Sequence, residues 1–309
     1  MQESLGKKSS ERPSKEESVI GSRLWLQQLN SFAMAFAQPI AMSREQRESF
    51  ERTVEWVFGP RVIGFSVAQW FSARERRLDY HKAPKEVVEH VRGNHKAEGI
   101  VIYVPGMFDT DTFERMKAMF DRVHPNIEDL RKEGWIALDW LYSGRDLDRI
   151  HTLQSHLLKL TEKHLARGAS VRLLGYSIGG LISKTVADSL SEKYPGHLGL
   201  VVHNCPLDPA AGFFVRWANM KRVQDSIAYE PHHAGEYPTV VLGGEKDGIV
   251  PHNSILRRRD NQEQIEPKVL KGSRHRDPCS SSEAQDRINA ALRLVSIKMP
   301  AFARQQVST

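Results

Sequence analysis

The segment VRLLGYSIGG, residues 171–180, combines the two local patterns that decide the fold. An apolar run suited to a buried β-strand comes first, and Gly175, Ser177 and Gly179 then alternate where that strand should end. A helical pattern, GGLISKTVADSLSEKY, follows at once. A serine between two glycines at a strand-to-helix turn is typical of a nucleophile elbow, because such a tight turn admits only small residues beside the reactive hydroxyl. The alternative is a glycine-rich turn whose serine caps the helix.

Strand and helix patterns alternate on both sides of this segment, from about residue 97 to residue 297. The other strand candidates are continuous apolar runs, which are typical of strands buried on both faces of a parallel sheet. We therefore predict an α/β fold with a mostly parallel central sheet and helices on both faces. Ligands of such sheets bind at the carboxyl ends of the strands. The strand candidates are EGIVIYVPG, GWIALDWLYSG, HLGLVVHNC, YPTVVLGG and PKVLKGS.

The first third of the chain has a different texture. Residues 1–18 are polar and charged, so we predict a disordered tail. Residues 19–80 carry amphipathic helical patterns such as SREQRESFERTVEWVFG, and we assign 19–96 to an N-terminal helical extension and 97–309 to the α/β domain. The aromatic residues of 19–80 suit a lid over the site, a homodimer interface or contact with a membrane surface, and they equally suit a packed core.

Composition places the chain among soluble globular proteins. It has 309 residues, of which 40% are hydrophobic, and its two cysteines make no disulfide framework. The charged start lacks the apolar run of a secretory signal, so we expect a cytoplasmic protein. Residues 24–42 carry no charge, but several polar residues interrupt them, which argues against a spanning helix.

Charge and ligand patterns exclude other classes of partner. The net charge of +6 is mild, and 38 acidic residues are interspersed with the basic ones. The arginine clusters at 74–77 and 257–259 fit solvated helix faces, and no zinc-finger spacing or aromatic RNA-binding signature accompanies them, so we expect no nucleic-acid partner. His232 and His233 are adjacent but lack the further ligands that a metal site needs. We expect no metal and no cofactor.

A catalytic serine needs a base and an acid, because its hydroxyl is a poor nucleophile near neutral pH. Asp247 follows the apolar run TVVLGG in the loop GGEKDGIVP. His275 follows the run KVL in GSRH, where the last strand should end. Both residues are thus placed at strand ends, and Ser177, Asp247 and His275 are the predicted catalytic residues.

Rival assignments remain for both partners of the serine. Asp208, in CPLDP, follows the preceding strand and is the main rival acid, while Glu245 is a weaker one. His252 is the rival base, although it lies where a helix should begin. Asp247 also suits a turn, and His275, which stands between two arginines, also suits a surface position.

In these motifs the chain resembles the α/β-hydrolase superfamily of serine esterases and lipases. GYSIGG is similar to its elbow, GGEKDGIVP to its acid loop and GSRH to its histidine loop, and the order Ser, Asp, His is the order of the family. The resemblance covers residues 97–297. It implies a cofactor-free serine hydrolase that cleaves a small-molecule carboxylic ester, thioester or lipid ester through an acyl-enzyme.

The resemblance also implies an oxyanion hole made of two main-chain amides. One donor is the N–H of Ile178, directly after the nucleophile, and the other is the N–H of Met107 in YVPGMF, with Phe108 as its rival. The family often has His-Gly where this chain has Pro105 and Gly106. Because the donor is a main-chain N–H, the loss of the histidine need not matter.

Other functions are also open. Lids of the family usually insert between its sixth and seventh strands. Here that interval, residues 207–236, is short for a large cap and holds the aromatic residues Phe213, Phe214 and Trp217. These side chains either wall an acyl pocket or pack a helix onto the sheet. The alternatives to an esterase are a non-catalytic binding protein with the same fold, and a lipase or acyltransferase held at a lipid interface by residues 19–80.

Overall fold

The computed structural model describes residues 84–107, 109, 112–124, 133–144, 146–207, 220–229, 237–245, 247, 250, 265–273, 275 and 281–306. All of them belong to one unit, Arg77–Thr309. Several predictions lie outside the described residues: the tail at 1–18, the helices at 19–80, the arginine clusters, Phe108, Asp208, the aromatic residues at 213–217, His232, His233 and His252.

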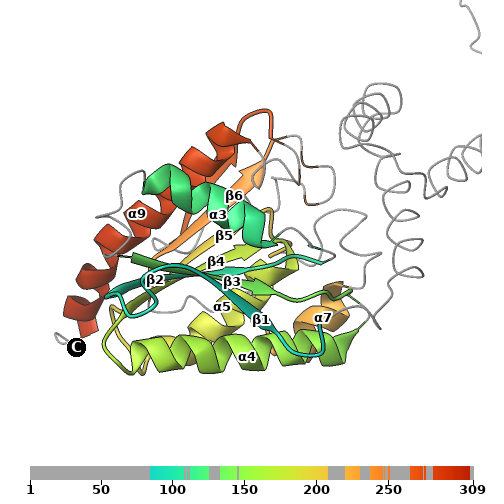
Figure 1. Ribbon diagram of the computed structural model, residues 1–309, viewed down its shortest axis with the longest axis horizontal. Coiled ribbons are helices and arrows are strands. Elements are labelled where there is room, and N and C mark those ends of the chain that lie inside the picture. Colours follow the sequence, from blue (N-terminus) through green and yellow to red (C-terminus); the bar gives the residue numbers. More distant parts are fainter. Residues whose placement is uncertain are drawn as a thin grey trace, which may run out of the picture. The chain divides into compact units, whose positions relative to one another are not determined.

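A seven-stranded sheet forms the centre of the described part (Figure 1). Its strands lie in the order β1-β3-β2-β4-β5-β6-β7, and all neighbours run parallel except β1 and β3. The crossover of β3 to the far side of β2 places β4 at the middle of the sheet. The strands are β1 (Val88–Gly93), β2 (Gly99–Val104), β3 (Glu133–Asp139), β4 (Ser170–Tyr176), β5 (Leu198–His203), β6 (Thr239–Gly244) and β7 (Ile265–Leu270).

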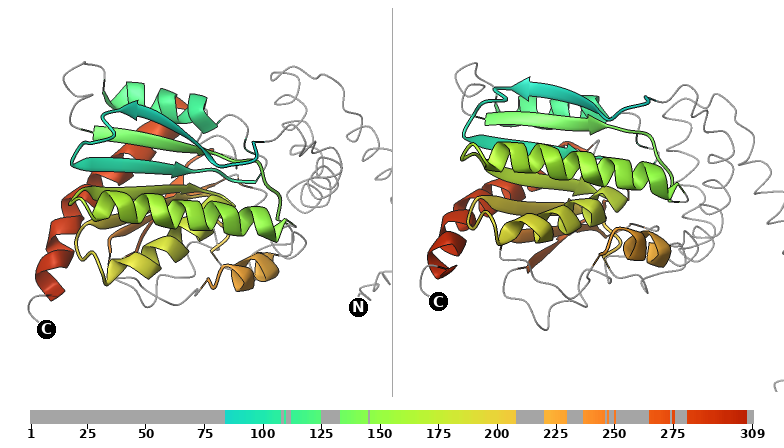
Figure 2. Two further views of the ribbon diagram at one scale, coloured as in Figure 1. Left: turned by 60° about the horizontal axis from the view of Figure 1, so that its bottom comes forward. Right: turned by 90° about the horizontal axis from the view of Figure 1, so that it is seen from below.

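Helices cover both faces of this sheet, as the sequence predicts. Helices α4 (Leu147–Leu165) and α5 (Ile178–Ser191) lie on one face, and α3 (Thr112–Val123) and α9 (Ser282–Gln306) lie on the other (Figures 1 and 2). Each face has its own apolar core, because alternate side chains of β2 and β4 point to opposite sides. The short helix α7 (Met220–Ser226) precedes β6.

The edge strand β1 corrects the expected domain boundary. Residues 19–96 were expected to form a helical extension, but Val88–Gly93 is a strand of the sheet, paired antiparallel with β3. Its sequence, VEHVRG, gives no apolar run because the strand is an edge whose Val88 and Val91 are 39% and 44% exposed. Main-chain pairing to β3, rather than burial of side chains, holds it in place.

The parallel strands carry their loops to one edge of the sheet. Met107 follows β2, Ser177 follows β4, Asn204 follows β5, Asp247 follows β6 and His275 follows β7. The predicted residues therefore reach the same edge from strands that are distant in the sequence. This is the edge at which ligands of α/β sheets bind.

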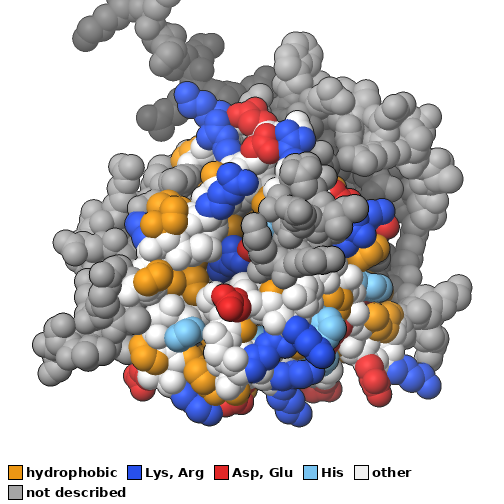
Figure 3. Space-filling view, turned by 60° about the vertical axis from the view of Figure 1, so that its left-hand side comes forward, with side chains coloured by type: hydrophobic (Ala, Val, Ile, Leu, Met, Phe, Trp, Pro, Cys, Tyr) orange, Lys and Arg blue, Asp and Glu red, His pale blue; other side chains and the backbone are white. Residues whose placement is uncertain are grey.

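Two surface features bear on the expected partners. Among the described helices, none has the length and apolar character needed to cross a bilayer. On the face shown in Figure 3, both basic and acidic side chains of the described part occur, with hydrophobic ones between them.

Candidate active site

The nucleophile elbow is a strained turn between β4 and α5. Ser177 has φ 52° and ψ −124°, which is an uncommon conformation for a residue with a side chain. Its N–H donates to the carbonyl of His203 on the neighbouring strand, at 3.1 Å, and this bond extends the β4–β5 ladder into the turn. The Ser177 side chain makes no capping hydrogen bond to α5. Ser177 therefore does not cap the helix through its side chain, as the alternative interpretation required.

Two glycines make this turn possible by close approach. A Cβ on Gly175 would lie 2.5 Å from the Cα of Gly180, where the helix turns back over the strand. A Cβ on Gly179 would lie 2.4 Å from the carbonyl oxygen of Pro105. The elbow thus packs directly against the loop after β2, and both positions exclude any larger residue.

The three predicted residues meet at the sheet edge. The Nδ1 atom of His275 lies 2.7 Å from Oδ2 of Asp247, and its Nε2 atom lies 3.3 Å from Oγ of Ser177. All three are buried, at 9%, 5% and 8% exposure respectively. The surface alternative for His275 is therefore wrong, since its ring lies between the other two side chains.

Hydrogen bonding fixes the direction of the imidazole. Since a carboxylate only accepts, Nδ1–H of His275 donates to Asp247, which leaves the lone pair of Nε2 facing the hydroxyl of Ser177. The hydroxyl then donates to Nε2. A separation of 3.3 Å is long for such a bond.

Asp247 is held by its own loop as well as by the histidine. Its Oδ1 accepts the N–H of Val250 at 2.9 Å, and its own N–H donates to the carbonyl of Gly244 at 3.1 Å. The rival acid Glu245 points elsewhere and accepts the N–H of Gly272 at 2.8 Å. Glu245 therefore anchors the turn after β7, and Asp247 is the carboxylate beside the imidazole.

The strand order, the single antiparallel edge strand and an elbow after the central strand β4 occur together in this chain. The chain has the α/β-hydrolase fold. No model of a protein family matches it, and no curated protein sequence does.

Solved structures with a similar course of the chain come from several organisms. Est1E from Butyrivibrio proteoclasticus is 13% identical, with a TM-score of 0.47, over 70% of this chain and 95% of that protein. A monoacylglycerol lipase from Paleococcus ferrophilus is also 13% identical, with a TM-score of 0.47, over 68% and 98%. The mouse alpha/beta hydrolase domain-containing protein 10 is 14% identical, with a TM-score of 0.46, over 68% and 93%. These similarities concern the fold alone.

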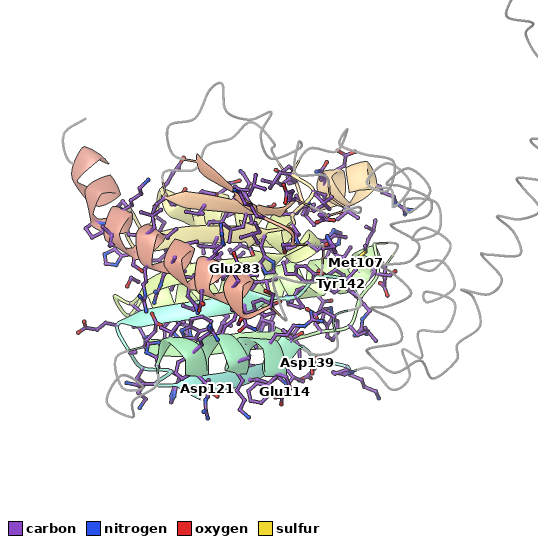
Figure 4. All side chains as sticks on the ribbon, turned by 90° about the horizontal axis from the view of Figure 1, so that it is seen from above. Met107, Glu114, Asp121, Asp139, Tyr142 and Glu283 are labelled. Carbon is purple, nitrogen blue, oxygen red and sulfur yellow. The ribbon has the colours of Figure 1, made fainter. Side chains whose placement is uncertain are left out.

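The loop after β2 lies where the predicted oxyanion donor should be. A Cβ on Gly106 would lie 3.0 Å from the Cβ of Ser177, so the main chain before Met107 passes directly beside the nucleophile. The hydroxyl of Tyr142, which is fully buried, donates to the carbonyl of Pro105 at 2.7 Å. Figure 4 shows Met107 and Tyr142 at the same end of the sheet. Sequence reasoning missed Tyr142, because it assigned residues 140–144 to an extended strand that in fact ends at Asp139.

A buried histidine lies behind the site. His203, at the end of β5, is 0% exposed, and burial, followed by the nearby His275 and Arg115, lowers its pKa to about 3. Its ring stacks on Tyr176 at 4.8 Å, and Tyr176 also contacts His275 at 5.3 Å. His203 therefore stays neutral near pH 7, and His275 is the histidine of this group that contacts the nucleophile.

The described residues were also searched for metal ligands. Within the described part, no three His, Cys, Asp or Glu side chains are placed to hold a metal ion. Cys205, which follows β5, is buried.

Proposed function

We propose that this protein is a serine hydrolase that cleaves a carboxylic ester through an acyl-enzyme. The observation that supports this most directly is the His275 imidazole between the Asp247 carboxylate and the Ser177 hydroxyl, at 2.7 and 3.3 Å. A purely structural serine needs neither a strained backbone nor an imidazole facing its hydroxyl.

In the first half of the reaction, Nε2 of His275 takes the proton of Ser177 while Oγ forms a bond to the ester carbonyl carbon. The Asp247 carboxylate, which is 0% exposed in its side chain, stabilises the resulting imidazolium. The tetrahedral intermediate then collapses. The carbon–oxygen bond to the alcohol breaks, and the imidazolium returns its proton to the departing alcohol.

In the second half, the same imidazole takes a proton from a water molecule that attacks the acyl-enzyme. Collapse of the second tetrahedral intermediate breaks the bond between the acyl carbon and Ser177 Oγ. The serine regains its proton from His275, and the carboxylic acid leaves. Each step uses only the three side chains, the ester and one water, so the balance requires no cofactor.

The oxyanion that forms in both halves needs donors that are already in place. Ile178 is the first residue of α5, and the first N–H groups of a helix have no partner within the helix. Met107 follows the residue that packs against Ser177. We propose the N–H groups of Ile178 and Met107 as these donors.

A fluorophosphonate probe tests this function. We expect the full chain to be labelled at Ser177, and the Ser177→Ala variant to lose both labelling and hydrolysis of a short-chain ester. Ser183→Ala is the matched control, since Ser183 is a fully buried serine within α5, the helix that begins directly after Ser177. Folded full-length protein that stays unlabelled would instead support the non-catalytic binding protein.

A further inference from the structure

The strands that carry Ser177 and His275 are not neighbours in the sheet. Ser177 follows β4 and His275 follows β7, and two strands, β5 and β6, lie between them. Since neighbouring strands are about 4.8 Å apart, the two strand ends are separated by roughly 14 Å. The segment that carries His275 must therefore return across β6 and β5, and something at that edge has to hold it there.

Asn204 stands in the gap, at the carboxyl end of β5. It is 0% exposed, and its own N–H donates to the carbonyl of Leu242 on β6 at 2.8 Å. Its φ of 50° lies in the left-handed region, which asparagine tolerates better than most residues. This backbone turns the Asn204 side chain away from the regular alternation of the strand.

The amide of Asn204 joins two of the three catalytic segments. Its Nδ2 donates to the main-chain carbonyl of His275 at 2.6 Å, and its Oδ1 accepts the N–H of Gly244 at 2.8 Å. Gly244 in turn accepts the N–H of Asp247. One side chain thus connects the histidine segment to the base of the acid loop.

The third segment is attached to the preceding residue. The carbonyl of His203 accepts the N–H of Ser177 at 3.1 Å. The dipeptide of residues 203–204 therefore contacts the nucleophile, the histidine segment and the base of the acid loop within two consecutive residues. Both hydrogen bonds of the Asn204 side chain are buried.

We propose that Asn204 is a positioning residue, whose side-chain amide holds the His275 main chain and the acid loop at the spacing that the proposed triad requires. This inference rests on the proposed function, because it concerns the same site. The Asn204 amide is bonded to main-chain atoms of His275 and Gly244, and its proposed effect on the reaction passes through these two residues.

The chemistry of the position calls for an amide. A carboxamide offers a donor and an acceptor together without charge, whereas a carboxylate offers acceptors only. Asn204→Asp therefore keeps the size and the bond from Gly244, but it sets an oxygen against the His275 carbonyl. Asn289 gives the matched control: it is a buried asparagine on α9 whose amide lies 3.5 Å from the carbonyl of Met119, on the α3 side of the sheet.

The kinetic test compares Asn204→Asp with Asn289→Asp in the full chain, with rates divided by the number of sites titrated by a fluorophosphonate. We expect Asn204→Asp to lower kcat by about tenfold to a hundredfold, because small displacements of a catalytic group have effects of that size, with KM almost unchanged. We expect Asn289→Asp to lower thermal stability without changing kcat per titrated site.

A spectroscopic test is independent of turnover. The Nδ1 proton of His275, bonded to Asp247 at 2.7 Å, should give a far-downfield proton signal in the wild-type protein. We expect Asn204→Asp to shift or remove this signal and Asn289→Asp to preserve it. If wild-type protein shows the signal but neither hydrolyses an ester nor reacts with the probe, the proposed function is wrong. The positioning role is then still tested by whether Asn204→Asp changes the signal.

Two results would overturn the proposal. One is an Asn204→Asp variant that keeps both the signal and kcat while losing as much stability as Asn289→Asp. The other is measured on the wild-type protein, so it can be obtained even if the variant does not fold. It is an exchange of the Asn204 Nδ2 protons with solvent that is as fast as the exchange of an exposed asparagine. Asn204→Gly, which accepts the same positive φ without a side chain, is the second variant to be measured in the same way.

Discussion

Removal of one hydroxyl group tests how the loop after β2 is held. Tyr142 is fully buried and donates to the Pro105 carbonyl at 2.7 Å, from the loop that follows β3. Burial raises the pKa of Tyr142 well above its usual value, so the hydroxyl remains a donor throughout the working pH range. Tyr142→Phe removes this donor and leaves the ring in place. The peptide unit that precedes Gly106 and Met107 then loses its anchor.

The magnitude follows from the burial of both partners. A buried carbonyl left without its hydrogen bond destabilises a protein by about 1–3 kcal/mol. For a domain of roughly 150–250 residues, each kcal/mol corresponds to about 2–4 °C in Tm. Because Met107 is a proposed oxyanion donor two residues away, we also expect kcat to fall about tenfold, which is equivalent to about 1.4 kcal/mol of transition-state stabilisation.

The assay separates these two effects. Tyr229→Phe is the control, since Tyr229 is a buried tyrosine whose hydroxyl donates to the Leu207 carbonyl at 3.2 Å, outside the loop after β2. We expect both variants to lower Tm, but only Tyr142→Phe to weaken binding of a boronic acid, which mimics the tetrahedral intermediate. If the two variants lose stability equally and bind the boronic acid equally well, Tyr142 has no role in shaping the oxyanion loop.

Four further predictions concern the site and its surroundings. Ser177→Ala should abolish probe labelling and leave Tm almost unchanged, and labelling of another serine in this variant would refute the assignment. Asp247→Asn should lower kcat by on the order of 10⁴-fold, whereas Asp208→Asn should have little effect; a reversed order in steady-state kinetics would move the acid to Asp208. Gly179→Ala should yield little folded protein by circular dichroism, because its Cβ would lie 2.4 Å from a carbonyl oxygen. The pKa of His203 is about 3 in the folded protein and 6.5 in the unfolded chain, so the unfolded protein is protonated first as pH falls. Stability should therefore decline between about pH 6.5 and pH 3. His203→Phe should reduce that decline by up to about 1.4 kcal/mol per pH unit in urea titrations, and an unchanged slope would contradict the prediction.

The fold was predictable where burial leaves a mark on the sequence. Strands such as β4 and β5 are covered on both faces, so they must be continuous apolar runs, and the pattern identifies them. The edge strand β1 has a single neighbouring strand and partly exposed side chains, and its polar sequence resembles a loop. The boundary at residue 97 was wrong for this reason.

The meeting of Ser177, Asp247 and His275 at one sheet edge was predictable, because each of them follows a recognisable strand. The elbow has a local signature, since Gly175 and Gly179 are imposed by close approach of the main chain. Asp247 and His275 have weaker signatures, and their identification depended on the parallel sheet, which brings all carboxyl strand ends to one edge. The rival Glu245 was resolved only by the direction of its side chain.

The residues that support the site left no such mark. Tyr142, His203 and Asn204 have no distinctive neighbours in the sequence, and each contacts a partner that follows the end of another strand. The partner of Tyr142 is 37 residues away and that of Asn204 is 71 residues away. A local pattern records the demands of local geometry, such as a tight turn or a buried face. The segment after β7 has to cross two strands to bring His275 to Ser177, and this requirement follows from the strand order of the folded sheet. The role of Asn204 can therefore be recognised only in the structure.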